Sequence, residues 1–237
     1  MGKTLIQQKR GKGSPKHRAP SFKYKGKIKH NKLLDKPAKG EVIDLIHCPG
    51  HNSPLAQIRY DTGEIVLINA PEGVKVGDAV KSGSIEEVNM GNTLPLKNIP
   101  EGTSIYNIEN NPGDGGRFVR SSGGFARVVT RMRNKIIVKM PSNKQKMFNP
   151  ECRAIIGVIA GGGRLEKPFL KAGNKFYAMK AKNKSWPKVC GTSMNAVDHP
   201  FGGSSSHTKG HHAESSRNAP TGRKVGKIAP RRTGKKR

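Results

Sequence analysis

The stretch Gly191–His207, GTSMNAVDHPFGGSSSH, places an acid directly before a histidine, at Asp198 and His199. A carboxylate beside an imidazole is a pairing used in general acid-base catalysis. Adjacent residues of an extended loop point apart, however, and an enzyme also needs a nucleophile or a bound water within reach. Glycines and serines follow, and they allow the backbone to approach a phosphate or base closely. The loop is therefore either an acid-base site using His199 or a surface that binds RNA through Asn195, Asp198 and His199.

Two glycine-rich stretches, Gly113–Gly116 (GDGG) and Gly161–Arg164 (GGGR), raise the possibility of nucleotide binding. Neither has the Lys and Ser or Thr of a P-loop, and no strand-helix-strand pattern surrounds them. We interpret them as turns or as places where the backbone approaches RNA.

Histidines and cysteines cluster without the spacing of a structural zinc site. The two candidate groups are HCPGH, with His47, Cys48 and His51, and HTKGHH, with His207, His211 and His212. The three cysteines, Cys48, Cys152 and Cys190, are too widely spaced to indicate a disulfide framework. We predict reduced thiols, no metal site and no cofactor.

The charge of the chain predicts a polyanionic partner. Its 237 residues carry 45 Lys and Arg against 16 Asp and Glu, a formal net charge of +29. Such an excess favours nucleic acid over an anionic membrane surface. No apolar run approaches the roughly 18 residues of a membrane span, and the lysine-rich start lacks the apolar segment of a signal peptide. We expect an intracellular protein with no membrane partner.

The charge is unevenly distributed along the chain. Residues 1–40 hold 13 bases and one acid, and residues 200–237 hold ten bases and one acid. Residues 41–110 reverse the sign, with ten acids and four bases. A general nucleic-acid or chromatin protein that relies on charge alone gains little from this acidic segment, although that alternative stays open.

The basic ends read as segments that are disordered when free and become ordered on RNA. The stretch SPKHRAPSFKYKGKIKH places Phe22 and Tyr24 among its bases, a pattern suited to stacking on exposed nucleobases. Permanently loose, solvated tails are the alternative.

Short apolar runs with turn residues between them predict an all-β core. The expected strands lie at residues 42–47, 55–60, 64–70, 74–80, 103–110, 125–132, 135–140 and 152–160. The proline-bounded residues 91–102 look like a linker between two small barrels of OB or SH3-like size, and no helical periodicity of useful length occurs. Alternation in residues 125–140 predicts two faces, either solvated or facing phosphates on the basic side. Val128, Thr130 and Met132 are expected on one face, and the other face is expected to hold mostly Arg127, Val129, Arg131 and Arg133.

Several long motifs resemble a known family. The motifs are GTSMNAVDHPFGG, GNTLPLKNIPEG, PGDGGRF, ECRAIIGV, APEGVKVGD and SRNAPTGRKVG, and they span nearly the whole chain. They are similar to the ribosomal protein L2 family of the large ribosomal subunit, in its archaeal form. The resemblance implies an OB-fold barrel followed by an SH3-like barrel, with basic extensions at both ends that thread into large-subunit ribosomal RNA.

The resemblance also implies partners and a location for the loop. In the family, the region matching Met194–Gly203 lies near the peptidyl transferase centre, and the histidine matching His199 has been discussed as aiding that activity. Where bacterial relatives have a second histidine after the proline, this chain has Phe201. The implied partners are large-subunit ribosomal RNA, other large-subunit proteins, the small subunit on association, and transfer RNA indirectly.

These interpretations lead to one set of expectations. The chain divides into a basic extension (1–40), an OB-like barrel (41–97), an SH3-like barrel (98–170) and a second basic extension (171–237). It acts as a structural, non-enzymatic protein of the cytoplasmic ribosome. The predicted RNA-binding residues are Lys9, Arg10, Lys12, Arg18, Phe22, Tyr24, Arg117, Arg120, Arg127, Arg131, Arg133, Arg164, Lys171, Lys175, Met194, Asn195, Asp198, His199, Gly202, Gly203, Arg217, Arg223 and Lys224.

Overall fold

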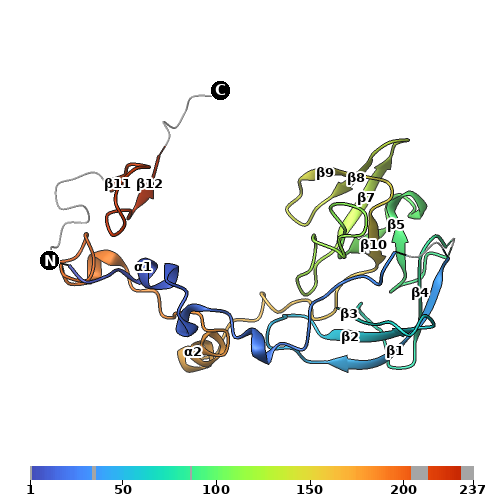
Figure 1. Ribbon diagram of the computed structural model, residues 1–237, viewed down its shortest axis with the longest axis horizontal. Helices are drawn as coiled ribbons and strands as arrows, with labels where there is room; N and C mark the ends of the chain where they lie inside the picture. Colours follow the sequence, from blue (N-terminus) through green and yellow to red (C-terminus); the bar gives the residue numbers. More distant parts are fainter. Residues whose placement is uncertain (1, 34–35, 86, 204–212, 231–237) are drawn as a thin grey trace. The chain divides into compact units, whose positions relative to one another are not determined.

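The chain forms two compact units (Figure 1). The computed structural model describes residues 2–33, 36–85, 87–203 and 213–230. Residues 21–168 make one unit, here called the strand unit. Residues 1–20 and 169–237 together make the other, here called the terminal unit. Segments from the two ends of the chain therefore share one unit.

The strand unit is built on one sheet of ten strands, which confirms the predicted all-β core. Along the sheet the order is β3-β2-β1-β4-β5-β10-β6-β7-β8-β9. Neighbours are antiparallel except β4 and β5, which are parallel. The strands are β1 (Ala38–Ile46), β2 (Leu55–Tyr60), β3 (Ile65–Asn69), β4 (Ala79–Ser82), β5 (Thr93–Pro95), β6 (Ser104–Tyr106), β7 (Ala126–Arg131), β8 (Ile136–Lys139), β9 (Gln145–Phe148) and β10 (Arg153–Ile156).

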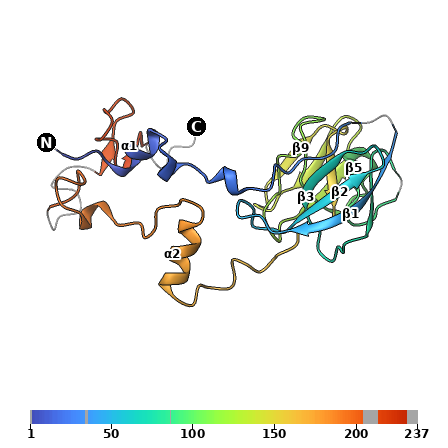
Figure 2. The same cartoon turned by 60° about the horizontal axis from the view of Figure 1, so that its bottom comes forward.

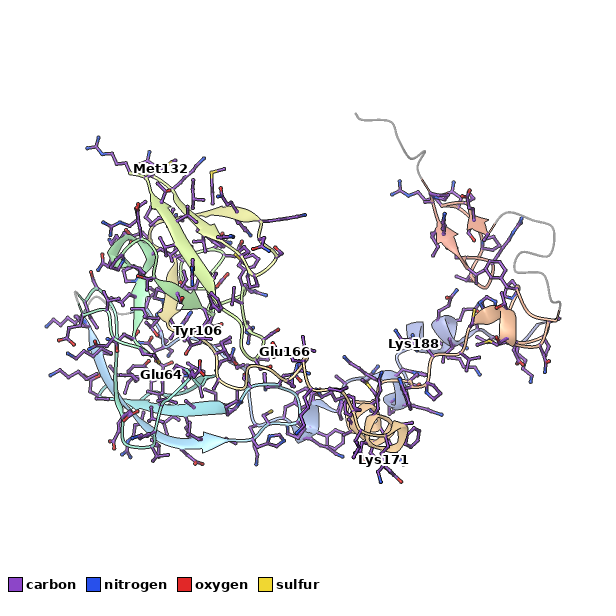
Figure 3. All side chains as sticks on the ribbon, turned by 180° about the vertical axis from the view of Figure 1, so that it is seen from behind. Glu64, Tyr106, Met132, Glu166, Lys171 and Lys188 are labelled. Carbon is purple, nitrogen blue, oxygen red and sulfur yellow. The ribbon has the colours of Figure 1, made fainter. Side chains whose placement is uncertain are left out.

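Two apolar cores lie within this unit. One gathers buried side chains from β1 to β4, among them Ile58 and Ile68, and the other gathers side chains from β5 to β10, among them Ile105 and Val138. Tyr106 belongs to the first core although it ends β6, and its hydroxyl donates to the carbonyl of Asn69 at 3.0 Å. Figure 3 shows Tyr106 among the strands. Strands β6 and β10 thus join the two cores.

The predicted linker at residues 91–102 is wrong. This segment contains β5 and a 3-10 turn, Leu96–Asn98, and the side chains of Leu94, Leu96 and Ile99 are fully buried. Its prolines suggested a connection, but a proline is tolerated at the end of a strand, where Pro95 lies. Strand β5 pairs with β10 in an antiparallel arrangement, so the segment is part of the sheet.

The predicted alternation along β7 is also wrong in its second half. The pairing of β7 with β8 shifts between Val128 and Thr130, so Thr130 rather than Val129 lies opposite Ile137. A bulge of this kind moves every later side chain to the other face. Arg127 and Arg131 therefore lie on opposite faces, and Arg131 shares its face with the buried Val128.

The segment before β1 packs on the edge of the sheet. Ile28 forms a parallel bridge with Leu67 of β3, and the Lys29 amide donates to the Leu67 carbonyl at 3.1 Å. Ile28 also joins a small core with Cys48 and Leu55. Figure 2 shows β1, β2 and β3 side by side in this part of the sheet. The sheet therefore covers its β3 edge with the chain's own backbone.

Among the residues that the structure describes, the terminal unit contains only short elements. They are α1 (Ile6–Gly11), a 3-10 turn at Pro15–His17, α2 (Ala172–Lys180), a 3-10 turn at Gly191–Ser193, and the parallel pair β11 (Glu214–Ser215) and β12 (Lys227–Ile228). A further 3-10 turn, Ser21–Lys23, opens the strand unit. Neither helix buries a residue, so neither needs an apolar face. This explains why the sequence shows no apolar periodicity that would predict these helices. Hydrogen bonds join the two ends, for example from the side-chain Nε2 of Gln7 to the Lys224 carbonyl at 2.8 Å.

Candidate nucleic-acid interface

The predicted basic residues near the N-terminus lie exposed on one short helix and its flanks. Lys9 and Arg10 form the last turn of α1, and Lys12 and Arg18 follow it. Residues 1–20 contain no acid that could pair with them. Cations at a helix C-terminus also interact favourably with the helix dipole. The structure therefore brings these four predicted residues into one exposed segment.

The two predicted aromatic residues differ in their surroundings. Phe22 is 84% exposed, with the Lys23 ammonium 5.7 Å from its ring centroid. Tyr24 is half-buried, packs against Gly50 and joins the small core around Cys48. Phe22 is thus free to stack on a base, whereas Tyr24 is largely committed to packing.

Arg117 and Arg120, three residues apart, also have different roles. Arg117 is 68% exposed and has Asp114 at 3.8 Å. Arg120 is half-buried and donates to the carbonyls of Ile28 at 3.1 Å and Gly116 at 3.4 Å. Burial and the nearby Arg117 charge lower the pKa of Arg120. Arg120 fastens the segment before β1 to the body, which leaves Arg117 as the arginine available to a partner.

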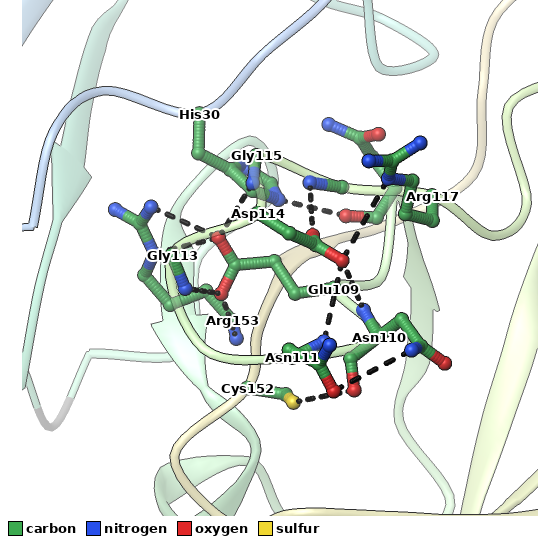
Figure 4. Close-up of polar contacts among 12 residues, drawn as sticks. His30, Glu109, Asn110, Asn111, Gly113, Asp114, Gly115, Arg117, Cys152 and Arg153 are labelled. Carbon is green, nitrogen blue, oxygen red and sulfur yellow. Dashed lines mark hydrogen bonds and ion pairs between the residues drawn. The ribbon is translucent and has the colours of Figure 1, made fainter.

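A buried polar network stands next to Arg120, and sequence reasoning missed it. Arg153 forms an ion pair with Glu109 at 2.9 Å, with side chains 6% and 0% exposed (Figure 4). The Glu109 carboxylate also accepts from the backbone amides of Gly113, Gly115 and Arg153, while Arg153 donates to the Asn31 carbonyl. Nothing in the local sequence links residues so far apart, because only the folded chain brings the loops at Asn31 and Glu109 to Arg153 of β10.

His30 completes the network. Its Nε2 lies 2.7 Å from the Asn107 carbonyl, and burial together with the Arg153 charge lowers the pKa of His30 from 6.5 to about 4. Burial opposes ionisation of Glu109, but the hydrogen bonds and charge of Arg153 outweigh burial and lower the pKa of this carboxyl. His30 is therefore neutral and Glu109 charged at neutral pH. The network holds residues 30–31 against the body of the strand unit.

The predicted arginines of β7 and of the turn that follows it lie around exposed hollows. Arg131 donates through Nη1 to the Lys97 carbonyl at 2.9 Å, and with Met132 and Arg133 it lines a cavity of about 560 Å³. Figure 3 shows Met132 at the projecting end of the β7–β8 hairpin. On the opposite face the Arg127 guanidinium lies 5.6 Å from the Phe125 ring. Both positions offer cations beside apolar side chains, a combination suited to phosphates and bases.

Arg164 and Lys146 lie in two further parts of the strand unit. Arg164 is exposed and donates to the Ser122 hydroxyl at 3.2 Å. Lys146, which sequence reasoning missed, places its ammonium 3.7 Å from the Phe118 centroid and donates to Asn110. An alternating strand pattern in residues 145–148 could have revealed β9 and this lysine, but the run is only four residues long.

Helix α2 presents aromatic and basic side chains together. Lys171 is its N-cap residue (Figure 3), and the Lys175 ammonium lies 5.4 Å from the Trp186 ring. Phe176 and Tyr177 contact each other edge to face and are 41% and 68% exposed. Interleaved cations and exposed rings are the pattern that single-stranded RNA binds.

The Gly191–Gly203 loop is held by its own backbone. The amides of Asp198 and His199 donate to the Asn195 carbonyl, and the Gly203 amide donates to the Met194 carbonyl at 3.0 Å. Gly203 has φ +80°, and a Cβ on Gly202 would overlap the Met194 and Asn195 carbonyls, so both positions require glycine. The predicted residues Met194, Asn195, Asp198, His199, Gly202 and Gly203 thus belong to one tight loop.

Asp198 and His199 do not form an acid-base pair. The Asp198 carboxylate lies 3.5 Å from the Lys3 ammonium, while His199 Nδ1 accepts a hydrogen bond from the Phe201 amide at 3.1 Å. The imidazole is therefore oriented by backbone rather than by the neighbouring carboxylate.

The three predicted residues near the C-terminus lie beside β11 and β12. Arg217 and Arg223 are exposed and Lys224 is half-buried. The Arg223 carbonyl accepts from the buried Ser215 hydroxyl at 3.1 Å, and the Lys224 carbonyl accepts from Gln7. The backbone carbonyls of Arg223 and Lys224 are used internally, and the side chains of all three residues remain available.

The described residues contain no group of three or more potential metal ligands. Cys48 is buried in the small core and its Sγ lies 3.1 Å from Nδ1 of the half-buried His51. His207, His211 and His212 lie outside the described residues. No helix within the described part of the chain is long and apolar enough to cross a membrane.

Comparison with known proteins identifies the family. Residues 3–82 match "Ribosomal Proteins L2, RNA binding N-terminal domain", and residues 89–221 match "Ribosomal Proteins L2, C-terminal domain". Proteins called "Large ribosomal subunit protein uL2" are similar over the full length of both chains. The identity is 52% over 240 residues with Methanococcus aeolicus, 51% over 241 with Methanothermobacter thermautotrophicus and 52% over 237 with Archaeoglobus fulgidus.

The family accounts for the two-core strand unit, since it implies an OB fold followed by an SH3-like fold. Both domain models of one family match this chain, and relatives from that family are about half identical to it over their full length. The chain belongs to the ribosomal protein L2 family.

Proposed function

We propose that this chain is a structural RNA-binding constituent of the large ribosomal subunit in the cytoplasm. It binds large-subunit ribosomal RNA and neighbouring ribosomal proteins there. One observation carries the proposal beyond family membership. The terminal unit holds 22 of the 45 Lys and Arg but only two of the 16 acids, Asp198 and Glu214. A unit so charged and so poorly buried needs a polyanion to neutralise it.

The role we propose is not enzymatic. Asp198 is paired with Lys3, and His199 Nδ1 is occupied by a backbone amide, so neither group is placed to move a proton for the other. Any contribution of the loop to peptide-bond formation is made by organising RNA near the reacting groups. The proposed location of Met194–Gly203 near the peptidyl transferase region rests on the family resemblance.

A general, charge-driven nucleic-acid protein fits the strand unit less well. Many of its acids have local roles: Glu64 accepts from the Lys32 amide, Asp61 from the Lys39 amide and Glu101 from the Arg131 amide. These carboxylates fix backbone geometry, and their charge still weakens attraction to phosphates over that surface. A protein built for indiscriminate binding would gain nothing from them.

The proposals about the small subunit and transfer RNA rest on the family resemblance. We propose contacts with the small subunit on association and an indirect effect on transfer RNA placement. The division into residues 1–40, 41–97, 98–170 and 171–237 is retained as a proposal about roles, in which the two basic ends bind RNA and the two barrels present loops to it.

The test is a comparison of nucleic acids at matched salt. The full chain is titrated with large-subunit ribosomal RNA and with random duplex DNA of equal length, across a range of salt concentrations. We expect tighter binding to the ribosomal RNA at every salt concentration, with a steep decline as salt rises. Equal affinity for both nucleic acids would support the charge-driven alternative and contradict the proposal.

A further inference from the structure

His199 is held in one orientation by two neighbouring residues, Phe201 and Gly191. Its Nδ1 accepts from the Phe201 amide at 3.1 Å, and the two rings meet at 60° with centroids 5.3 Å apart. On the other side the imidazole lies against Gly191, where any Cβ would overlap the ring. Glycine at 191 is therefore needed for the ring to lie where it does.

This orientation fixes which ring nitrogen carries the proton. A backbone amide can only donate, so Nδ1 must offer its lone pair to Phe201. In the neutral imidazole the hydrogen then resides on Nε2. Within the described part of the chain, Nε2 has no hydrogen-bond partner. His199 thus has one N–H donor that no other described residue uses, and no free lone pair.

Lys3 lies beside the same loop. Its backbone amide donates to the Val197 carbonyl at 2.8 Å, and its ammonium lies 3.5 Å from the Asp198 carboxylate. The Lys3 side chain is 69% exposed, so the ammonium keeps donors for another partner. The N-terminal segment therefore brings a cation to the loop that carries His199.

A cavity of about 310 Å³ opens at this junction. Its lining comes from three segments: residues 2–5 with Gln8; Ala196, Val197, His199 and Pro200; and Thr221 with Gly222. Four of the lining side chains can donate hydrogen bonds, namely those of Lys3, Thr4, His199 and Thr221. A donor-rich cavity that includes a cation fits a phosphate, whose oxygens only accept.

We propose that this cavity binds one RNA phosphodiester, with the His199 Nε2–H and the Lys3 ammonium as donors to its non-bridging oxygens. The inference rests on the proposed function, because it assigns a specific contact within the RNA-binding role. His199 acts as a fixed hydrogen-bond donor and positions RNA. The site is distinct from the exposed cations of α1 and α2, which neutralise phosphates without a built cavity.

The experiment uses phosphorothioate interference on large-subunit ribosomal RNA. Sulfur replaces one non-bridging oxygen at random positions, the full chain selects the RNA that still binds, and cleavage maps the excluded positions. The wild-type chain is expected to exclude a set of phosphates. Two variants remove the proposed donors: His199→Asn keeps an acceptor for the Phe201 amide but has no group at Nε2, and Lys3→Met removes the ammonium.

Both variants should lose interference at the same single phosphate and bind RNA about tenfold or more weakly, as expected for lost charge-assisted hydrogen bonds. The control Lys188→Met removes an exposed charge outside the cavity and should keep that interference. If His199→Asn and Lys3→Met retain the wild-type pattern, or lose unrelated phosphates, the inference is wrong. If wild type shows no selective binding of ribosomal RNA, the proposed function itself has failed.

Discussion

The two units of this protein reach order by different means. The strand unit buries two apolar cores and a buried ion pair, and it balances 23 bases with 14 acids. The terminal unit buries few of its described residues, namely Leu5, Pro20, Gly202, Ser215 and Val225, and its charge is overwhelmingly positive. A region with few buried apolar contacts opens at low free-energy cost. The strand unit is thus expected to fold by itself, while the terminal unit depends on RNA.

The largest expected effect comes from breaking the buried ion pair of the strand unit. Replacing Arg153 with Met leaves the Glu109 charge buried without its partner. We expect the free energy of unfolding of the full chain to fall by about 3–5 kcal/mol. Urea denaturation followed by circular dichroism measures it. Lys97→Met breaks the exposed pair with Glu151 instead and should cost less than about 1 kcal/mol. Equal losses of unfolding free energy in the two variants would show that the buried ion pair stabilises the fold no more than an exposed one.

Acidification should weaken the same unit through His30. Its pKa is about 4 when folded and 6.5 as the ordinary value, so the unfolded chain binds the proton more readily between these pH values. Stability is complete above pH 6.5 and is lost as pH falls towards 4, by roughly 3 kcal/mol from this group. Arg153, Glu109 and Asp114 are the charged groups that act on it.

The measurement is urea denaturation of wild type and His30→Gln at several pH values between 7 and 4.5. Glutamine can still donate to the Asn107 carbonyl but does not titrate. We expect a smaller loss of stability on acidification in the variant. A pH dependence identical to that of wild type would remove His30 from this account.

In the terminal unit the expected effects appear in RNA binding rather than in stability. Tyr177 is 68% exposed, so Tyr177→Ala should change the free energy of unfolding by less than about 0.5 kcal/mol. Loss of a stacking ring should weaken binding to large-subunit RNA by about 1–3 kcal/mol. The matched control is Ile65→Ala, which removes an exposed apolar side chain from β3 in the acidic part of the strand unit. If Tyr177→Ala destabilised the free protein and left RNA binding intact, the proposed difference between the two units would be wrong.

The smallest expected effect is on the helix content of α2. A Cβ on Gly173 of α2 meets nothing within 4 Å, and alanine is favoured over glycine in a helix by up to about 1 kcal/mol. Gly173→Ala should raise the helical signal of the free chain slightly and leave RNA affinity equal or a little tighter. A loss of affinity would mean that RNA packs directly against this glycine.

The sequence was informative where order is local and poor where it depends on distant contacts. Alternating apolar runs correctly predicted most strands, since each run buries one face regardless of its neighbours. The bulge that separates Arg127 from Arg131 left no sequence signal, because it depends on pairing between β7 and β8. The linker prediction failed because Pro95 ends a strand whose partner, β10, comes about 60 residues later.

The same distinction applies to the candidate site. Charge and motif alone pointed to the loop around His199 and to the basic ends. The pairing of Asp198 with Lys3 joins residues at opposite ends of the chain, and no spacing rule could have found it. Arg120 looked like a phosphate ligand by type, yet its donors are directed to backbone carbonyls.

Hydrogen exchange of the full chain, free and bound to large-subunit ribosomal RNA, tests the difference between the two units most directly. We predict that β1 to β10 are protected in both states, whereas α2 and the Gly191–Gly203 loop exchange rapidly when free and become protected on RNA. Equal and strong protection of both units in the free protein would contradict the account. So would a terminal unit that stays unprotected in the complex.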